Sequence, residues 1–128
     1  HKRGYIPMRY ARLTKRREFV TLNKSGRSQV TPAFVLLAHP SPTPNTTRIG
    51  YTASRKVGNA VHRNRAKRRM RAVFDAVLRL NPTPPNPKEW DFVMIARHKV
   101  FERDFEKMCR DFKTAVEAFE HDPVDTQN

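Results

Sequence analysis

The fold is decided by the stretch SRKVGNAVHRNRAKRRMR at residues 54–71, which carries eight Lys or Arg residues and no acid. Interpreted as a helix from about Asn59 to Leu80, it places apolar side chains at spacings of three and four on one face. These apolar side chains are Ala66, Met70, Val73 and Val77. The opposite face receives Asn64, Arg65, Arg68 and Arg71. The sequence therefore predicts a helix with one core face and one strongly cationic face.

The cationic face contains conflicts that destabilise an isolated helix. Arginines near a helix N-terminus oppose the helix dipole, and like charges three or four residues apart, such as Arg65 and Arg68, repel each other. No acid within the stretch relieves either conflict. A solvated face usually mixes charges of both signs. Because a polyanion would relieve both conflicts, the pattern indicates a functional, nucleic-acid-binding surface.

The composition supports this interpretation. The 128-residue chain has a net charge of +14, with an excess of Lys and Arg over Asp and Glu of 26 to 12. Residues 1–74 carry all of the excess, because Glu18 is their only acid, whereas residues 75–128 are net negative. Arg outnumbers Lys, and its planar guanidinium favours phosphates and bases over a membrane surface. At this length we expect a single RNA-binding domain over residues 1–128.

Other features of the sequence indicate the cellular compartment in which we expect the protein. The single cysteine, Cys109, excludes an internal disulfide and is typical of a reducing compartment. The longest apolar run, Ala33–Ala38, is far too short to span a membrane. The basic N-terminus has no apolar segment behind it and so does not resemble a secretory signal. We therefore expect a cytoplasmic protein with no membrane partner.

Hydrophobic patterning predicts an α+β fold with the order α-β-β-β-α-β-α. We expect helices over 14–24, 59–80 and 101–119, and strands over 29–31, 33–39, 48–54 and 90–97. The expected architecture is a two-layer sandwich, with three helices on a four-stranded mixed sheet. A basic arm at residues 1–11 and a frayed tail at 122–128 flank it. In the last helix a stripe from Phe101 to Phe119 is interpreted as core.

A strand that runs into RKVGNAV (55–61) and then RNR-x-KR (63–68) resembles the bacterial ribonuclease P protein subunit. The resemblance covers about residues 12–120 and includes four shorter segments. These are Arg12-Leu13, Glu18-Phe19, Phe34-Val35-Leu36 and Ile95-Ala96-Arg97. It implies a fold like the second domain of ribosomal protein S5, with a left-handed β-α-β crossover against the usual rule.

The resemblance also implies a function and two RNA partners, ribonuclease P RNA and precursor tRNA. The protein would help the catalytic RNA remove the 5′ leader in a Mg²⁺-dependent endonucleolytic reaction, with the Mg²⁺ bound mainly by RNA and no protein partner required. Residues expected to contact the catalytic RNA are Arg55, Lys56, Asn59, Arg63, Asn64, Arg65, Lys67, Arg68, Arg69 and Arg71. Residues expected in a leader cleft between the first helix and the sheet are Arg12, Lys15, Phe19, Phe34 and Leu37.

Single strands bind on aromatic platforms beside basic grooves, and Phe19 and Phe34 are the candidates in the cleft. Core packing is the alternative for both. The family commonly has further aromatics where this chain has Asn23 and Leu37. That departure predicts weaker base stacking here.

The sequence offers no catalytic or metal-binding residues for the protein itself. No acid lies between Glu18 and Asp75, so the basic region cannot assemble the carboxylate cluster that protein nucleases use. The acids of the last helix alternate with basic residues and are typical of an ion-paired surface. Two other classes stay open, a structural RNA-binding protein of ribosomal type and a DNA-binding protein. Asn64 beside arginines is weak support for the latter.

Overall fold

The structure is a computed structural model that describes residues 8–82 and 89–121. Its strands are β1 (Arg9–Arg12), β2 (Arg27–Val30), β3 (Phe34–Pro40), β4 (Thr46–Thr52) and β5 (Trp90–Ala96). Its α-helices are α1 (Arg16–Ser25), α2 (Ala60–Phe74) and α3 (Phe105–Glu120). Short helical turns η1 (Arg55–Val57) and η3 (His98–Phe101) precede α2 and α3, and a π-helical turn η2 (Asp75–Arg79) extends α2. The α+β class is therefore confirmed, with one strand added before the predicted order.

The sheet has five strands in the order β1-β4-β5-β3-β2, so the prediction of four was wrong. The additional strand, β1, forms from residues expected to belong to a basic arm, and it pairs in parallel with β4. Its burial pattern shows no apolar alternation, so the sequence lacks the signal that identifies a strand. Strands β4 and β5 are also parallel and adjacent, and α2 joins them. The left-handed crossover stays a prediction, and the expected tail at 122–128 lies outside the described residues.

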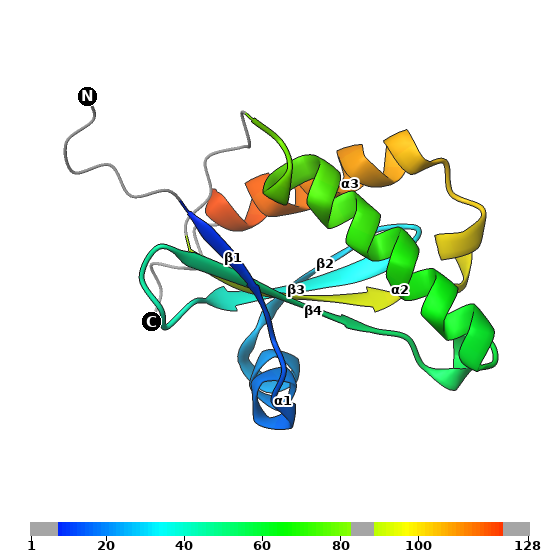
Figure 1. The fold of residues 1–128 in the computed structure, drawn as a ribbon, viewed down its shortest axis with the longest axis horizontal. Helices are drawn as coiled ribbons and strands as arrows, with labels where there is room; N and C mark the ends of the chain where they lie inside the picture. Colours follow the sequence, from blue (N-terminus) through cyan, green and yellow to red (C-terminus); the bar gives the residue numbers. More distant parts are fainter. Residues whose placement is uncertain (1–7, 83–88, 122–128) are drawn as a thin grey trace.

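The main core fills the face of the sheet that α2 and α3 cover (Figure 1). Phe112 of α3 lies at its centre, with ring centroids 6.4, 6.0 and 6.0 Å from those of Phe34, Phe74 and Phe92. The predicted apolar stripe of the last helix is confirmed from Met108 to Phe119. That helix begins only at Phe105, because the Asp104 side chain accepts the backbone N–H of Lys107 and caps it.

Helix α1 packs on the opposite face of the sheet, so the two-layer prediction was wrong (Figure 1). A smaller core there joins Leu13, Leu22, Leu37 and Val93 to the half-buried Phe19. Gly50 permits the contact, because a Cβ at this position would lie 2.5 Å from the Phe19 ring. In β3 and β5, alternate residues point to opposite faces of the sheet and belong to the main core and the smaller core in turn. Both faces are apolar, and helices cover both.

An ion-paired group fastens α1 to the sheet. The Arg48 guanidinium donates to both carboxylate oxygens of Asp91, at 2.9 and 2.6 Å, and to Glu18 at 2.8 Å. The other Glu18 oxygen accepts the backbone N–H groups of Thr14 and Lys15. The bond from Lys15 contributes most to lowering the pKa of Glu18, and Thr14 and Arg48 act in the same direction against burial. Glu18 therefore links the start of α1 to β4 and β5 in its ionised form.

This linkage predicts an acid-sensitive step in stability. Because the folded pKa of Glu18 lies below its unfolded value of about 4.3, its contribution is present above that pH and is lost as the pH falls through the folded pKa. We expect Glu18→Gln to lower the free energy of unfolding at pH 7 by about 1 kcal/mol and to reduce the further loss between pH 5 and pH 3. Denaturant unfolding at each pH measures both effects.

The control is Glu117→Gln, which changes an exposed carboxylate on α3. An equal loss in the two variants, or an unchanged acid profile in Glu18→Gln, would contradict the role of Glu18.

Candidate nucleic-acid interface

The loop before α2 fixes where the basic helix begins. Gly58 has φ of 138°, and a Cβ there would lie 2.7 Å from the Cβ of His62, so only glycine fits. The Asn59 side chain then accepts the backbone N–H of His62 at 3.0 Å and caps the helix. Asn59, predicted to contact RNA, therefore has a structural role that explains its position. The predicted start of the basic helix near Asn59 is confirmed.

The outer surface of α2 and η1 presents cations to solvent. Arg55, Lys56, Arg65 and Arg68 are exposed on it beside the uncharged Asn64, and Arg63 and Lys67 are half-buried. Two of the arginines are held in place by the protein. The Arg65 guanidinium lies 5.4 Å from the ring centroid of Phe101, and Arg63 donates to the carbonyl of Gly58 at 3.1 Å. Phe101, expected to belong to the core stripe, is half-buried and supports Arg65 from η3.

Arg69 does not belong to this outer surface, because its side chain turns toward α3. Its guanidinium donates to the carbonyls of Val100 at 2.7 Å and Arg103 at 2.6 Å, and to the sulfur of Met108 at 3.4 Å. These three contacts engage Nε and one terminal nitrogen. The prediction treated Arg69 as an RNA contact, whereas the structure shows an attachment of α2 to the segment that leads into α3.

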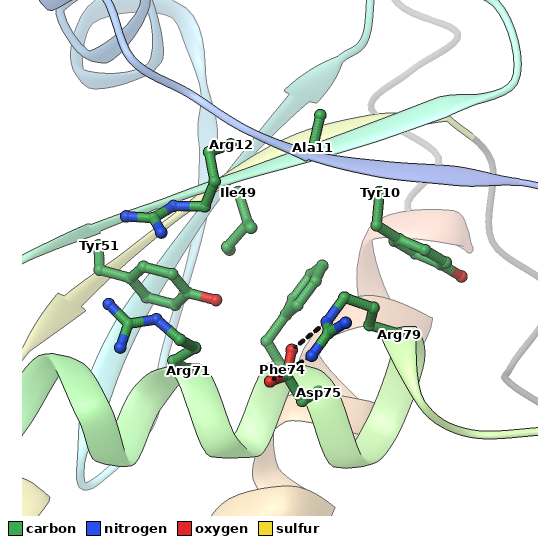
Figure 2. Close-up of a pocket in the computed structure, with 9 residues that line it drawn as sticks. All are labelled: Tyr10, Ala11, Arg12, Ile49, Tyr51, Arg71, Phe74, Asp75 and Arg79. Carbon is green, nitrogen blue, oxygen red and sulfur yellow. Dashed lines mark hydrogen bonds and ion pairs between the residues drawn. The ribbon is translucent and has the colours of Figure 1, made fainter.

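Arg71 also departs from the predicted outer face. Its guanidinium lies 5.5 Å from the Tyr51 ring centroid, on the side of α2 that faces the sheet. Arg12 lies at the same distance from that ring (Figure 2). Arg12 was predicted in the leader cleft, but it points to the face of the sheet that carries α2. The two arginines, expected at different RNA contacts, share one pocket.

The predicted leader cleft needs a second correction, at Phe34. This residue is fully buried in the main core under α3, so it does not line a cleft beside α1. Leu37 does lie on the α1 face but is buried beneath the helix. Phe19 lies on that face and is half-buried, and Lys15 is exposed at the start of α1. Of the five predicted residues, only Lys15 and Phe19 offer both the correct face and an accessible surface.

An accessible row of side chains beside α1 was missed by the sequence interpretation. Val30, Val35, Ile95 and Thr52 are register neighbours across β2, β3, β5 and β4. Val30 is 66% exposed, and the other three are half-buried. The alternation of each strand places them on the same face as Leu37 and Val93. This row, called the open floor below, could have been found from strand parity once the register was known.

Comparisons with known proteins agree with this geometry. Residues 8–120 match the family model for ribonuclease P. The chain belongs to the ribonuclease P protein family. It is 35% identical over 109 residues to the ribonuclease P protein component of Caulobacter vibrioides, covering 85% of this chain and 70% of that relative. It is 38% identical over 96 residues to that of Bacillus pumilus, covering 75% and 76%.

A solved structure supports the same assignment. The ribonuclease P protein from Thermotoga maritima superposes with a TM-score of 0.67 at 32% identity, covering 83% of this chain and 94% of that one. This chain is thus the accessory protein component of an RNA-containing endoribonuclease that matures the 5′ end of tRNA. Ribonuclease P RNA is its partner. Of the three classes that the sequence left open, family membership selects the ribonuclease P protein over a structural RNA-binding protein and a DNA-binding protein.

Within residues 8–82 and 89–121, no helix has the length and apolar character needed to cross a membrane.

The contacts of Arg69 predict a difference between neighbouring arginines. Arg69→Met would leave the carbonyls of Val100 and Arg103 without their donor, which costs roughly 1–3 kcal/mol of stability. Arg68→Met removes an exposed charge and should change stability by less than about 0.5 kcal/mol. Thermal and denaturant unfolding of both variants measure this difference. Equal stabilities would show that Arg69 does not attach α2 to α3.

Proposed function

We propose that this chain uses opposite faces of its sheet for two RNAs. The exposed cations of α2 and η1 bind the catalytic RNA, and the open floor beside α1 binds the 5′ leader of precursor tRNA. The observation that carries the first part is the acid-free outer surface of α2, where Phe101 and the Gly58 carbonyl orient Arg65 and Arg63. Oriented guanidinium groups bind phosphates with a smaller loss of side-chain freedom.

The open floor supports the leader assignment by its shape and chemistry. Val35 and Ile95 supply half-buried apolar surface, and the partly exposed ring of Phe19 borders it. Single-stranded bases are held by such surfaces when cations follow the backbone. Lys15 at the start of α1 is exposed and supplies one cation. The four residues of the open floor include no aromatic side chain on which a base could stack. We therefore expect weak leader binding with little sequence preference.

Several acidic side chains near these surfaces are already paired with arginines. Glu18 and Asp91 bind Arg48, and Asp75 binds Arg79. No cluster of three or more His, Cys, Asp or Glu side chains with ligand geometry occurs within the described residues. We propose that the Mg²⁺ of the reaction is held mainly by RNA phosphates, while the protein neutralises neighbouring phosphates and positions the substrate. The cytoplasmic location stays a prediction.

The catalytic-RNA surface can be tested with Arg65→Gln combined with Arg68→Gln. Both side chains are exposed, so stability should change by less than about 0.5 kcal/mol. Removing two phosphate contacts should lower the slope of log K against log salt by about 1.4–1.8. Cleavage of precursor tRNA should fall most at low Mg²⁺ and recover partly at high Mg²⁺, because the ion neutralises the same phosphates. Filter binding and single-turnover cleavage measure the two quantities.

The matched control, Arg110→Gln with Lys113→Gln, removes the same charge from exposed positions on α3. If this control lowers the slope and the activity equally, the outer surface of α2 has no special role.

The leader surface can be tested by adding the aromatic that this chain lacks. Asn23 is exposed on α1, one turn beyond Phe19. Asn23→Phe should add a stacking platform beside the open floor and strengthen binding of precursor tRNA by roughly 1–3 kcal/mol. Mature tRNA, which has no leader, should bind as before. Equilibrium binding of both RNAs to the assembled holoenzyme measures the difference.

The control is Val20→Phe, which places a phenyl ring at a position of α1 that is 39% exposed and absent from the core beside the floor. A similar gain from both variants, or a gain for mature tRNA, would contradict the proposed leader site.

A further inference from the structure

A cavity of about 220 Å³ lies between the edge strand β1, strand β4 and the end of α2 (Figure 2). It opens on the α2 face of the sheet and is separate from the open floor beside α1. Its lining residues are Tyr10, Ala11, Arg12, Ile49, Tyr51, Arg71, Phe74, Asp75 and Arg79. Its volume is below the roughly 300–1,000 Å³ of pockets that hold drug-sized ligands. The cavity therefore suits one small group, such as a phosphate with part of its nucleotide.

The charges around this cavity are unbalanced. Arg12 from β1 and Arg71 from α2 each place a guanidinium carbon 5.5 Å from the Tyr51 ring centroid. Figure 2 shows one guanidinium above this ring and the other below it. The only carboxylate of the lining is Asp75, which binds Arg79 in bidentate fashion at 2.7 and 3.0 Å. Two cations, one on each face of the Tyr51 ring, are thus left without a lining carboxylate of their own.

Neighbouring groups do not supply the missing negative charge. Burial, followed by the proximity of Asp75, raises the pKa of the Tyr51 hydroxyl, so this side chain stays neutral. The Nε of Arg71 is shielded from solvent and has no hydrogen-bond partner among the described residues. A buried donor without an acceptor is unfavourable. An anion that contacts both guanidinium groups beside the Tyr51 ring would offset their repulsion and supply acceptor oxygens.

The position of Arg71 indicates which anion. It lies three residues after Arg68 on α2, and side chains at this spacing are neighbours on a helix surface. The cavity therefore lies one turn of α2 away from the cationic surface that we assign to the catalytic RNA. Phosphate oxygens match the planar fork of a guanidinium, and the apolar walls formed by Ile49 and Phe74 can contact the attached sugar or base.

We propose that this cavity binds one phosphodiester of an RNA strand, with Arg12 and Arg71 holding the phosphate from two different elements. This proposal rests on the assignment of α2 to RNA binding and adds a site outside the helix's exposed face. The shared chemistry is an RNA phosphate, and it has two possible sources. One is the ribonuclease P RNA, and the other is the leader of precursor tRNA.

The test uses Arg12→Gln combined with Arg71→Gln in the full chain. One arm measures binding to ribonuclease P RNA alone between 50 and 200 mM salt. The other measures binding of precursor and mature tRNA to the assembled holoenzyme. In the arm that contains the true source, affinity should fall about tenfold or more, and the slope of log K against log salt should decrease by about 0.7–0.9. Loss in the first arm assigns the catalytic RNA, and loss for precursor alone assigns the leader.

Two further variants keep the test decisive. Arg110→Gln with Lys113→Gln controls for net charge, and an equal effect there would overturn the proposal. Arg12→Lys with Arg71→Lys keeps both charges but loses the planar fork, so it should lower affinity while preserving the salt slope. Thermal unfolding of the Gln pair, compared with that of the wild-type protein, shows whether charge loss or misfolding causes any defect.

The outcomes separate this site from the proposed function on which it rests. If wild-type protein binds both RNAs and the Gln pair behaves as the control does, only the cavity proposal fails. If wild-type protein binds neither RNA, the assignment of α2 to RNA binding fails with it.

Discussion

The burial of one face of α2 is the constraint on which the rest of the structure depends. Ala66, Met70 and Val73 are fully buried on this face, although the helix carries six Lys or Arg residues and no acid. Each like-charge pair at helical spacing costs a few tenths of a kcal/mol. Burying a large apolar side chain contributes about 1.5–3 kcal/mol, so packing on the sheet outweighs the repulsion. The helix can therefore keep its cations unpaired for a polyanion, because its stability comes from the opposite side.

The same geometry divides the arginines of α2 into three roles. Those on the outer surface face solvent, Arg69 turns toward α3, and Arg71 turns toward the sheet. A helix with 3.6 residues per turn sends successive residues in directions about 100° apart. Arg68 and Arg69 are chemically identical neighbours, yet only Arg69 meets carbonyl groups. The difference lies in where η3 and α3 pack, and this is not encoded locally around either residue.

Long, strongly patterned elements of this chain could be predicted from the sequence, and their contacts could not. The basic helix and the apolar stripe of α3 follow from helical periodicity. Strand β1 has no such pattern, because it is an edge strand with mostly exposed side chains. The cleft residues illustrate a different error. Phe34 and Leu37 are three residues apart in one strand, so alternation sends them to opposite faces, and they cannot line the same cleft. The continuous apolar run of β3 concealed this, because both faces of the strand are buried.

Strand β4 connects the two proposed RNA-binding sides of the molecule through three consecutive residues. Gly50 allows Phe19 to approach and so sets the position of α1. Tyr51, on the opposite face, separates Arg12 from Arg71. Thr52 returns to the first face and continues the open floor. Because a slip of one residue would exchange the two faces of this strand, its register determines the proposed leader surface and the proposed phosphate cavity together. The parallel pairing of β4 with both β1 and β5 therefore positions both proposed RNA-binding surfaces as well as the two cores.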